Sequence, residues 1–194
     1  MKTIISYGNG LSWVELYPPE IPDASKELEL CTQNPNSHYL TDSCRYYFLK
    51  GENLILATVC YKDNIIVVHG KNSAVPKIRF RSQVLSLINT LKLTPIDTVA
   101  SRDFAVLGLF KYRSNWFSTR DLTSGLSFGA SLNFNNLRIG RLPDNLRIHG
   151  DFSLCNTHLK RLPNNLEVRG TLDLRYNQLL VLPPSINAKE VLHD

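Results

Sequence analysis

Five thiol and imidazole side chains in the first seventy residues have the chemistry that a reaction would need: Cys31, His38, Cys44, Cys60 and His69. Gathered in space, they would offer a thiol–imidazole pair for nucleophilic catalysis or ligands for a metal ion. Their order contains no Cys-x-x-Cys pair and no spacing typical of a metal site. A cysteine inside an apolar strand, as Cys60 is, is more often a small core residue. We therefore predict no catalytic and no metal-ligating residue.

The glycine-containing stretches do not indicate a cofactor site. The stretch Gly70–Ser73 (Gly-Lys-Asn-Ser) lacks the leading glycine of a phosphate-binding loop, and Gly8-x-Gly10 alone is too short for a dinucleotide fingerprint. We expect no cofactor. An enzyme of unrecognised type in the amino-terminal part of the chain stays open as an alternative.

The composition is that of a folded soluble protein. The chain has 194 residues, of which 43% are hydrophobic and 20% charged, with a net charge of +5. This basic excess permits an acidic protein or a nucleic acid as partner. The apolar runs are shorter than a membrane span, the first residues lack a secretory core, and the cysteines show no disulfide framework. We expect a cytoplasmic protein with reduced thiols and no membrane partner.

Residues 1–120 are predicted to form an α+β domain with an antiparallel hairpin sheet and helices. Turn-forming residues at 51–53 and 62–64 separate apolar runs, as they do in β-hairpins. Helical spacing of apolar residues after Ser82 predicts a helix that Ser82 caps and Pro95 ends. The expected strands are Ser12–Leu16 at an edge, Arg45–Lys50, Leu54–Tyr61, Ile65–His69 and Val106–Tyr112. The expected helices are Lys26–Thr32 after a cap at 23–25, Gln83–Leu93 and Ala100–Ala105, and Arg113–Arg120 is expected to be a connector.

Residues 121–194 repeat with a period of 20. Six apolar positions keep this register over three units: Leu122, Leu126, Phe128, Leu132, Phe134 and Ile139, with apolar residues again 20 and 40 positions later. One unit cannot bury six apolar side chains alone, but stacked units share one core. We predict a parallel β solenoid of three 20-residue units followed by a C-terminal cap. Gly150 and Gly170 hold matching places and favour a tight turn with positive φ.

These units resemble the short Leu-Pro leucine-rich repeats of bacteriophage and prophage proteins. The matching form is Leu-Pro-x-x-Leu-x-Val-x-Gly-x-Leu-x-Leu, which begins here at Leu162. The resemblance implies a curved parallel-strand scaffold and a role in binding, and no reaction. One column holds Leu137, Thr157 and Asn177, so we expect the buried asparagine ladder of standard repeats to be absent or degenerate.

The block Leu30–Pro76 distantly resembles the PcfJ-like domain of conjugative plasmids and phages. The matching pieces are Leu30–Thr32, Tyr47–Lys50, Ile55–Val59 and Val68–Pro76. This resemblance implies no activity. Together with the repeats, it implies that a mobile element encodes the chain and that the chain works in a bacterial host cytoplasm.

Residues between the core positions of the repeats predict two surfaces for partner binding. The first, of mixed charge, lies on the strands, and we call it the sheet-face patch. The second lies along the loops, and we call it the basic edge. The sheet-face patch contains Arg147, His149, Glu167, Arg169, Asp173 and Arg175, and the basic edge contains Arg138, Arg141, His158, Lys160 and Arg161.

These features predict a non-catalytic interaction protein that binds, and possibly inhibits, a host bacterial protein such as a defence factor. Mixed charge favours a protein partner, because a surface that follows phosphates is more uniformly basic. The alternative is a nucleic-acid-binding accessory protein, in which basic and aromatic side chains alternate. That set contains Arg79, Arg81, Lys111, Tyr112, Arg113, Trp116, Phe117 and Arg120.

Both ends of a solenoid expose core and need a cover. We expect residues 1–120 to pack on the first coil through Trp116, Phe117 and Leu122, so that the chain unfolds as one unit. If the tail Ser185–Asp194 leaves the far edge open, we expect a homodimer through that edge.

Overall fold

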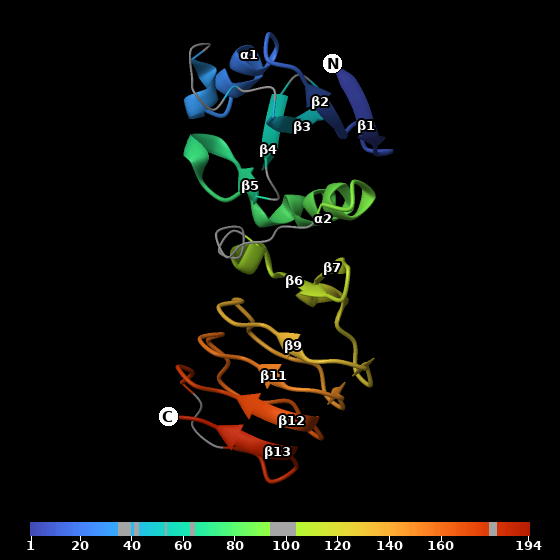
Figure 1. Ribbon diagram of the computed structural model, residues 1–194, viewed down its shortest axis with the longest axis vertical. Coiled ribbons are helices and arrows are strands. Elements are labelled where there is room, and N and C mark those ends of the chain that lie inside the picture. Colours follow the sequence, from blue (N-terminus) through green and yellow to red (C-terminus); the bar gives the residue numbers. More distant parts are fainter. Residues whose placement is uncertain (35–39, 41–42, 53, 63–64, 94–103, 179–181) are drawn as a thin grey trace. The chain divides into compact units, whose positions relative to one another are not determined.

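The computed structural model divides into two compact units, Met1–Asp103 and Phe104–Asp194 (Figure 1). The sequence places the domain boundary after residue 120, whereas the compact units divide after Asp103, so residues 104–120 fold together with the repeats. The structure describes residues 1–34, 40, 43–52, 54–62, 65–93, 104–178 and 182–194.

The first unit is built on a five-stranded antiparallel sheet in which each strand pairs with its neighbour in sequence. The strands are β1 (Lys2–Ser6), β2 (Ser12–Leu16), β3 (Arg45–Gly51), β4 (Leu54–Lys62) and β5 (Ile65–His69). The hairpin block β3–β5 is confirmed. The sequence does not predict β1, which pairs with β2, so the expected edge strand Ser12–Leu16 lies inside the sheet.

The described residues of this unit include two α-helices, α1 (Ile21–Lys26) and α2 (Arg81–Thr90). The predicted helix Lys26–Thr32 is wrong, because Pro22 fits the first helical turn and α1 ends at Lys26, where the predicted helix begins. Ser82 lies inside α2, and neither helix has a side-chain cap hydrogen bond. Short 3₁₀ helices occupy Cys31–Gln33, Lys71–Ser73 and Ile78–Phe80. None of the helices in the described residues is long and apolar enough to cross a membrane.

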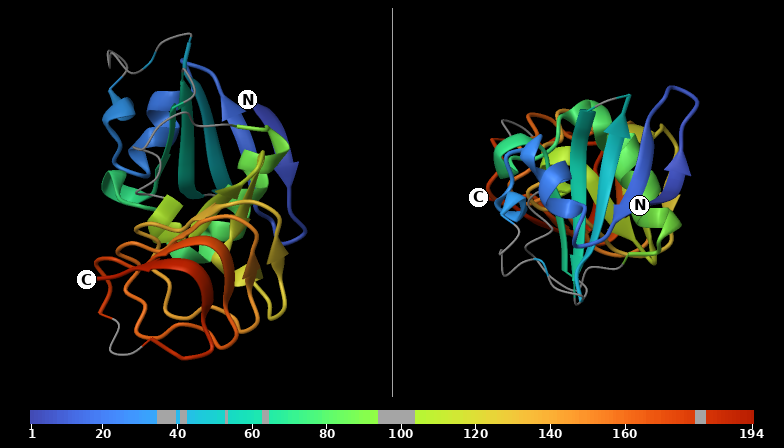
Figure 2. Two further views of the ribbon diagram at one scale, coloured as in Figure 1. Left: turned by 60° about the horizontal axis from the view of Figure 1, so that its bottom comes forward. Right: turned by 90° about the horizontal axis from the view of Figure 1, so that it is seen from above.

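The helices cover opposite faces of the sheet (Figure 2). Val14 of β2 lies opposite Phe48 of β3, in a core cluster that includes Ile21 of α1. The neighbouring Trp13 points to the other face and donates its indole N–H to the carbonyl oxygen of Gln83 in α2, at 2.8 Å. A strand buried on both faces is apolar at successive positions, which explains the unbroken apolar run in β3.

The second unit begins with a short helical segment and a β-hairpin, whose first strand falls within the predicted strand Val106–Tyr112 and whose second falls within the predicted connector Arg113–Arg120. Residues 104–107 are helical, and β6 (Leu109–Tyr112) pairs with β7 (Asn115–Ser118). The turn between them places Arg113 at a φ of 54°, and no glycine marks that position in the sequence. A 3₁₀ turn, Thr119–Asp121, follows β7. Of the predicted helix Ala100–Ala105, residues 100–103 lie outside the described residues.

This hairpin covers the first coil of the repeats with aromatic rings. The Phe110 ring lies 4.5 Å from the Phe134 ring, and the Tyr112 ring lies 5.0 Å from the Phe128 ring, centroid to centroid. Phe110 belongs to the same buried cluster as the apolar residues of the coils. The amino-terminal end of the solenoid is therefore capped within the second unit itself.

The expected capping contact through Trp116 is wrong. Trp116 lies on β7 and packs against Phe104, with ring centroids 4.6 Å apart. Phe117 is 37% exposed and stacks on Phe110 at 5.8 Å. Leu122 packs against the core of the coils as expected. Side chains alternate along β6. Because Phe110 faces the coils, its sequence neighbours Leu109 and Lys111 point away from them.

The remaining residues form a parallel β-solenoid (Figure 1). Arg147 pairs with Ser127 and with Glu167, and Phe152 pairs with Leu132 and with Leu172, so successive coils are in a 20-residue register. The strands are β8 (Ser127–Phe128), β9 (Leu132–Asn133), β10 (Arg147–Ile148), β11 (Phe152–Ser153), β12 (Glu167–Asp173) and β13 (Asn187–Leu192). The α+β class and the solenoid are confirmed.

β13 ends the solenoid with a shortened repeat. It pairs with β12 at an offset of 20 between Val168 and Ala188, and of 19 between Leu172 and Val191. Because this repeat is one residue shorter, a strict 20-residue pattern does not predict this coil. Leu182, Ile186, Ala188 and Val191 are partly buried and pack against the core.

Gly150 and Gly170 serve a close approach between coils, and neither has the positive φ that the sequence analysis expects. A Cβ on Gly150 would lie 2.6 Å from the amide nitrogen of Ser131, and one on Gly170 would lie 2.9 Å from the carbonyl carbon of Gly150. Only a residue without a Cβ fits at such distances. Ala130 is tolerated at the same place in the first coil because no coil precedes it.

The degenerate asparagine column is confirmed. Asn177 donates its side-chain amide to the carbonyl oxygens of Leu154 and Leu174, at 2.7 and 2.8 Å, and accepts the amide hydrogen of Thr157 at 3.0 Å. Thr157 is fully buried and donates its hydroxyl to Leu154, whereas Leu137 is simply apolar core. One asparagine thus satisfies buried carbonyls of two coils.

Candidate functional site

The thiol and imidazole candidates of the first unit are brought together only in part. Cys60 of β4 and His69 of β5 line a cavity of about 350 Å³ together with Tyr46. The side chains of Cys31 and His38 fall outside the described residues. Within the described residues, no three His, Cys, Asp or Glu side chains are placed to hold a metal ion.

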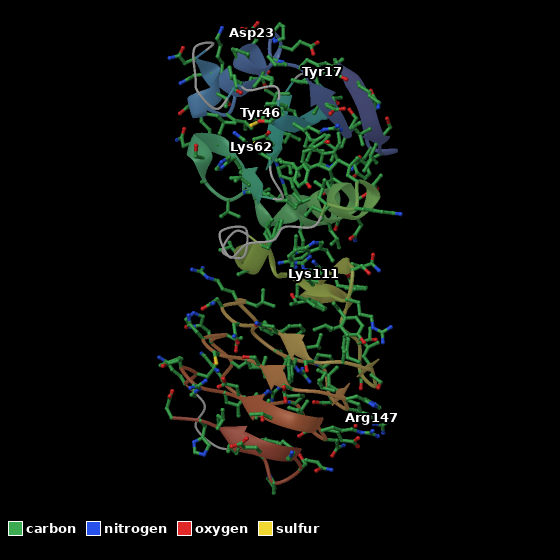
Figure 3. The ribbon with its side chains drawn as sticks, viewed as in Figure 1. Tyr17, Asp23, Tyr46, Lys62, Lys111 and Arg147 are labelled. Atoms are coloured by element: carbon green, nitrogen blue, oxygen red, sulfur yellow. The ribbon has the colours of Figure 1, made fainter. Side chains whose placement is uncertain are left out.

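Tyr46, which is labelled in Figure 3, limits what this cavity can do chemically. The residue is 4% exposed, and burial, followed by the nearby Cys60 and Cys44, raises the pKa of its phenol far above the usual value. The phenol is therefore protonated at neutral pH and cannot take a proton from the Cys60 thiol. The His69 ring nitrogen Nδ1 lies 3.2 Å from the carbonyl oxygen of Ser73.

Backbone amides of the loop at Gly70 donate hydrogen bonds to carbonyl oxygens of the protein itself. The amide of Gly70 donates to the Ala74 carbonyl at 2.6 Å, and the amide of Asn72 donates to the Leu28 carbonyl at 2.7 Å. A phosphate-binding loop instead points successive amide hydrogens at the anion. This loop therefore closes the end of β5.

The sheet-face patch is exposed, but many of its charges are paired within it. Arg147 extends outward from the coils (Figure 3), and its Nε lies 3.3 Å from Oε2 of Glu167 in the next coil. His149 Nε2 lies 3.2 Å from the hydroxyl of Ser127. Arg169 is exposed and has no ion pair within the part of the chain that the structure describes.

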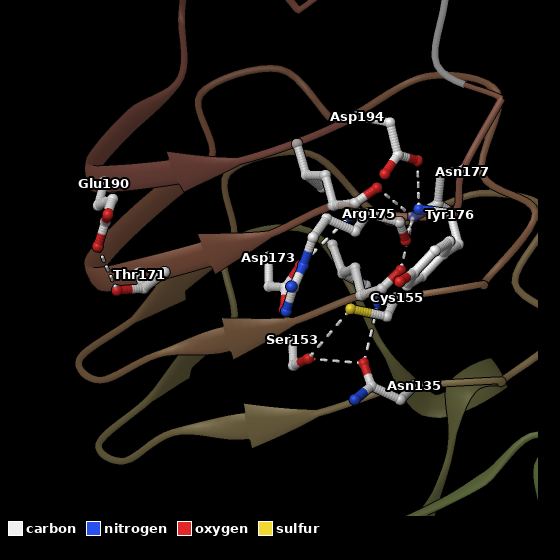
Figure 4. Close-up of polar contacts among 12 residues, drawn as sticks. Asn135, Ser153, Cys155, Thr171, Asp173, Arg175, Tyr176, Asn177, Glu190 and Asp194 are labelled. Atoms are coloured by element: carbon white, nitrogen blue, oxygen red, sulfur yellow. Dashed lines mark hydrogen bonds and ion pairs between the residues drawn. The ribbon is translucent and has the colours of Figure 1, made fainter.

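The carboxyl-terminal end of this patch is tied into a polar network (Figure 4). Arg175 donates to both carboxylate oxygens of Asp173, at 2.9 and 2.7 Å, and this contact lowers the pKa of Asp173 to about 2. Burial, and then the Asp173 carboxylate, raise the pKa of the Cys155 thiol. The Cys155 amide and the Ser153 hydroxyl both donate to the side-chain oxygen of Asn135. Cys155 is thus a protonated, half-buried thiol in a structural network.

The basic edge keeps most of its charge free of acidic partners. All five of its side chains are exposed. Arg141 and Arg161 lie in successive coils and flank a hollow of about 90 Å³ that Asp144 and Asn164 also line. Asp144 is 4.0 Å from Arg141, at the limit of an ion pair, and accepts the amide hydrogen of Asn164 at 2.9 Å. Among the described residues, no carboxylate pairs with Arg161 or with the other basic-edge cations, Arg138 and Lys160.

The sequence analysis did not identify the residues that hold the coils, and the columns of side chains on them, in place. Two columns take positive φ in three successive coils: Gly125, Asn145 and Asn165, and Asn136, Asn156 and Tyr176. Glycine and asparagine tolerate this conformation best. The Asn165 side chain donates to Asn145, and the Asn156 side chain donates to Asn136, each at 3.0 Å. The recurrence of asparagine at a 20-residue spacing could have indicated these positions in the sequence.

The residues of the alternative nucleic-acid surface are partly used for packing. Arg81 is 8% exposed and Trp116 is 9% exposed. The Tyr112 ring packs on Phe128, and its hydroxyl accepts the amide hydrogen of Gly129 at 2.9 Å. These three side chains stabilise the fold, while Lys111, Arg113 and Arg120 remain exposed.

No family model, curated protein or solved structure matches this chain, so the geometry above carries the functional argument.

Proposed function

We propose that this chain is a non-catalytic protein-interaction protein and that the basic edge of its solenoid is the main binding surface. Parallel strands stack at roughly 4.8 Å, so the coils hold exposed side chains in fixed columns. Such preorganisation reduces the ordering cost of binding. The observation that carries the proposal is the row of four exposed Lys and Arg side chains along the loops, of which Arg141 and Arg161 flank a hollow lined by one carboxylate, Asp144.

The sheet-face patch supports a secondary role in this binding. Arg147 is engaged by Glu167, and Arg175 is engaged by Asp173, so a partner would first have to break these pairs. On the basic edge, the described residues form one such contact, between Arg141 and Asp144 at 4.0 Å, and its other cations have no acidic partner among them. Charge complementarity then favours a partner with an acidic surface.

The origin and setting of this function rest on the sequence resemblances. Short Leu-Pro leucine-rich repeats and a PcfJ-like block support a phage or mobile-element protein that acts in the cytoplasm of a bacterial host. Binding and inhibiting a host protein, such as a defence factor, is the role that this origin favours. The homodimer through the β13 edge remains a separate prediction, tested by sedimentation of the full chain.

Affinity capture from a bacterial lysate treated with nuclease tests the proposal. The edge variant carries Arg141→Glu and Arg161→Glu, and a control with the same charge change carries Lys111→Glu and Lys189→Glu, which lie outside both patches. All four side chains are exposed, so neither variant removes core. We expect one specific host protein to bind the native chain and the control, and to be lost from the edge variant.

Equal retention by the edge variant would reject the basic edge as the binding surface. Absence of any specific protein, together with turnover of a metabolite by the pure chain, would reject a non-catalytic role. Tight binding of the pure chain to DNA or RNA that falls steeply with salt would instead support the nucleic-acid alternative.

A further inference from the structure

A second pocket lies in the first unit, apart from the surfaces described above. Its volume is about 430 Å³, and sites for small ligands typically measure about 300–1,000 Å³. Its apolar wall includes Leu28, Leu54, Leu56, Val75 and Phe80. Leu54, one of these lining residues, is 63% exposed. The pocket therefore offers apolar surface that the fold itself leaves open.

Cations line the rim of this pocket. Lys71, Lys77 and Arg79 all contribute to it, and Lys71 pairs with Glu29 at 2.8 Å. The guanidinium of Arg79 lies 4.7 Å from the centre of the Phe80 ring, which holds this charge beside the apolar wall. Among the described residues, no carboxylate pairs with Lys77 or Arg79.

The one acidic side chain among the described lining residues, that of Glu27, already accepts a hydrogen bond. The carboxylate of Glu27 accepts the amide hydrogen of Ile55 at the start of β4. It therefore offers little compensation for the charges of Lys77 and Arg79. The pocket combines an open apolar wall with two cations that have no acidic partner there.

We propose that this pocket binds a small amphipathic anion, a hydrocarbon body carrying one carboxylate. The hydrocarbon part lies against the leucines and Phe80, where its removal from water drives binding. The carboxylate lies at the rim beside Lys77 and Arg79, where ionic hydrogen bonds set the orientation. This ligand site is independent of the solenoid surface and goes beyond the function proposed above.

Binding to the full chain can be followed with anilinonaphthalene sulfonate, a fluorescent aromatic probe with one negative charge. Decanoate, decanol and decyltrimethylammonium share a hydrocarbon chain and differ in head-group charge. We expect decanoate to displace the probe at a concentration about tenfold lower than the other two, a preference of about 1.4 kcal/mol. Ala74→Trp, at an exposed lining position, should fill the pocket and abolish probe binding.

Two charge reversals separate the pocket from general electrostatics. Lys77→Glu should weaken decanoate binding about tenfold, whereas Lys111→Glu, an equal change at an exposed site in the second unit, should leave it unchanged. Equal effects of the two variants, or equal displacement by decanol and decanoate, would overturn the proposal. Displacement by polyglutamate below the effective decanoate concentration would assign the site to an acidic polypeptide instead. Circular dichroism confirms that each variant is folded.

Discussion

The two units of this chain bury their cores in different ways. In the first unit, residues far apart in sequence meet across a sheet covered on both faces, as in the hydrogen bond from Trp13 to Gln83. In the second unit, the strand pairings between coils join residues 20 positions apart, in the adjacent coil. A sheet of the first kind is completed only when all of its parts are present. A solenoid depends instead on its regular spacing and on covered ends.

This difference also separates the two proposed binding sites. The first unit leaves a pocket where its strands and the segment after β5 meet, which suits a small ligand. The second unit repeats exposed side chains in columns, which suits a macromolecular partner. The four predictions below test the comparison, beginning with the largest expected effect.

Removing the hairpin β6–β7 should abolish folding of the coils. A fragment of residues 104–194 should be soluble and fold cooperatively, whereas residues 121–194 should aggregate or remain unfolded. The shorter fragment exposes Phe128 and Phe134, which Phe110 and Tyr112 cover in the native chain. Circular dichroism and sedimentation measure both properties. A soluble, monomeric and cooperatively folding 121–194 fragment would show that the hairpin is not a required cap.

Phe48→Ala and Phe152→Ala should each destabilise one unit by about 3–5 kcal/mol, because both rings are fully buried. Since the two rings lie in separate core clusters, we expect separate transitions, in contrast to the single unit that the sequence predicts. Each unit contains one tryptophan, Trp13 or Trp116. Denaturant unfolding of the variants in Trp13→Phe and Trp116→Phe backgrounds therefore reports each unit by fluorescence.

The outcome of that experiment decides how far the units cooperate. Independent units shift only the tryptophan signal of the unit that carries the substitution. If both signals shift together in both variants, the chain unfolds as one unit and the sequence-based expectation holds.

Gly150→Ala should destabilise the second unit by about 1–3 kcal/mol, because its Cβ would overlap the Ser131 backbone of the preceding coil. Gly140 provides a matched control. It lies in the same repeats, lacks positive φ, and a Cβ there meets nothing within 4 Å. Gly140→Ala should change the free energy of unfolding by less than about 0.5 kcal/mol. Equal effects in chemical denaturation would remove the close-approach explanation.

Low pH should lower the free energy of unfolding of the second unit, because Asp173 becomes protonated. Its pKa is lowered from 3.8 to about 2 in the folded chain, so the stabilisation is complete above pH 4 and is lost as the pH falls toward 2. Because Arg175 is 47% exposed, we expect only about 1 kcal/mol. Comparing urea unfolding of the native chain and Asp173→Asn measures this contribution. The difference in free energy of unfolding between the two proteins should be present at pH 6 and vanish near pH 2. A difference independent of pH would contradict a contribution from the ionised Asp173.

The sequence by itself determined the parts of the fold that depend on local pattern. The 20-residue period predicts the stacked coils, because a repeated apolar position occupies the same place in every coil. The turn residues between apolar runs predict β3, β4 and β5. The candidate surface residues could also be named, since the positions between core positions face outward, and all except the half-buried Asp173 are exposed.

Only the tertiary structure decided which neighbours those residues have. Arg147 and Arg161 are the same residue type on neighbouring coils, but the first meets Glu167 and the second meets no carboxylate among the described residues. Phe110, rather than Trp116, covers the first coil because the hairpin turns it inward. Gly150 is needed because the preceding coil lies against it. Burial and charge pairing are set by contacts between segments that have come together in the fold, and a local sequence pattern does not encode them.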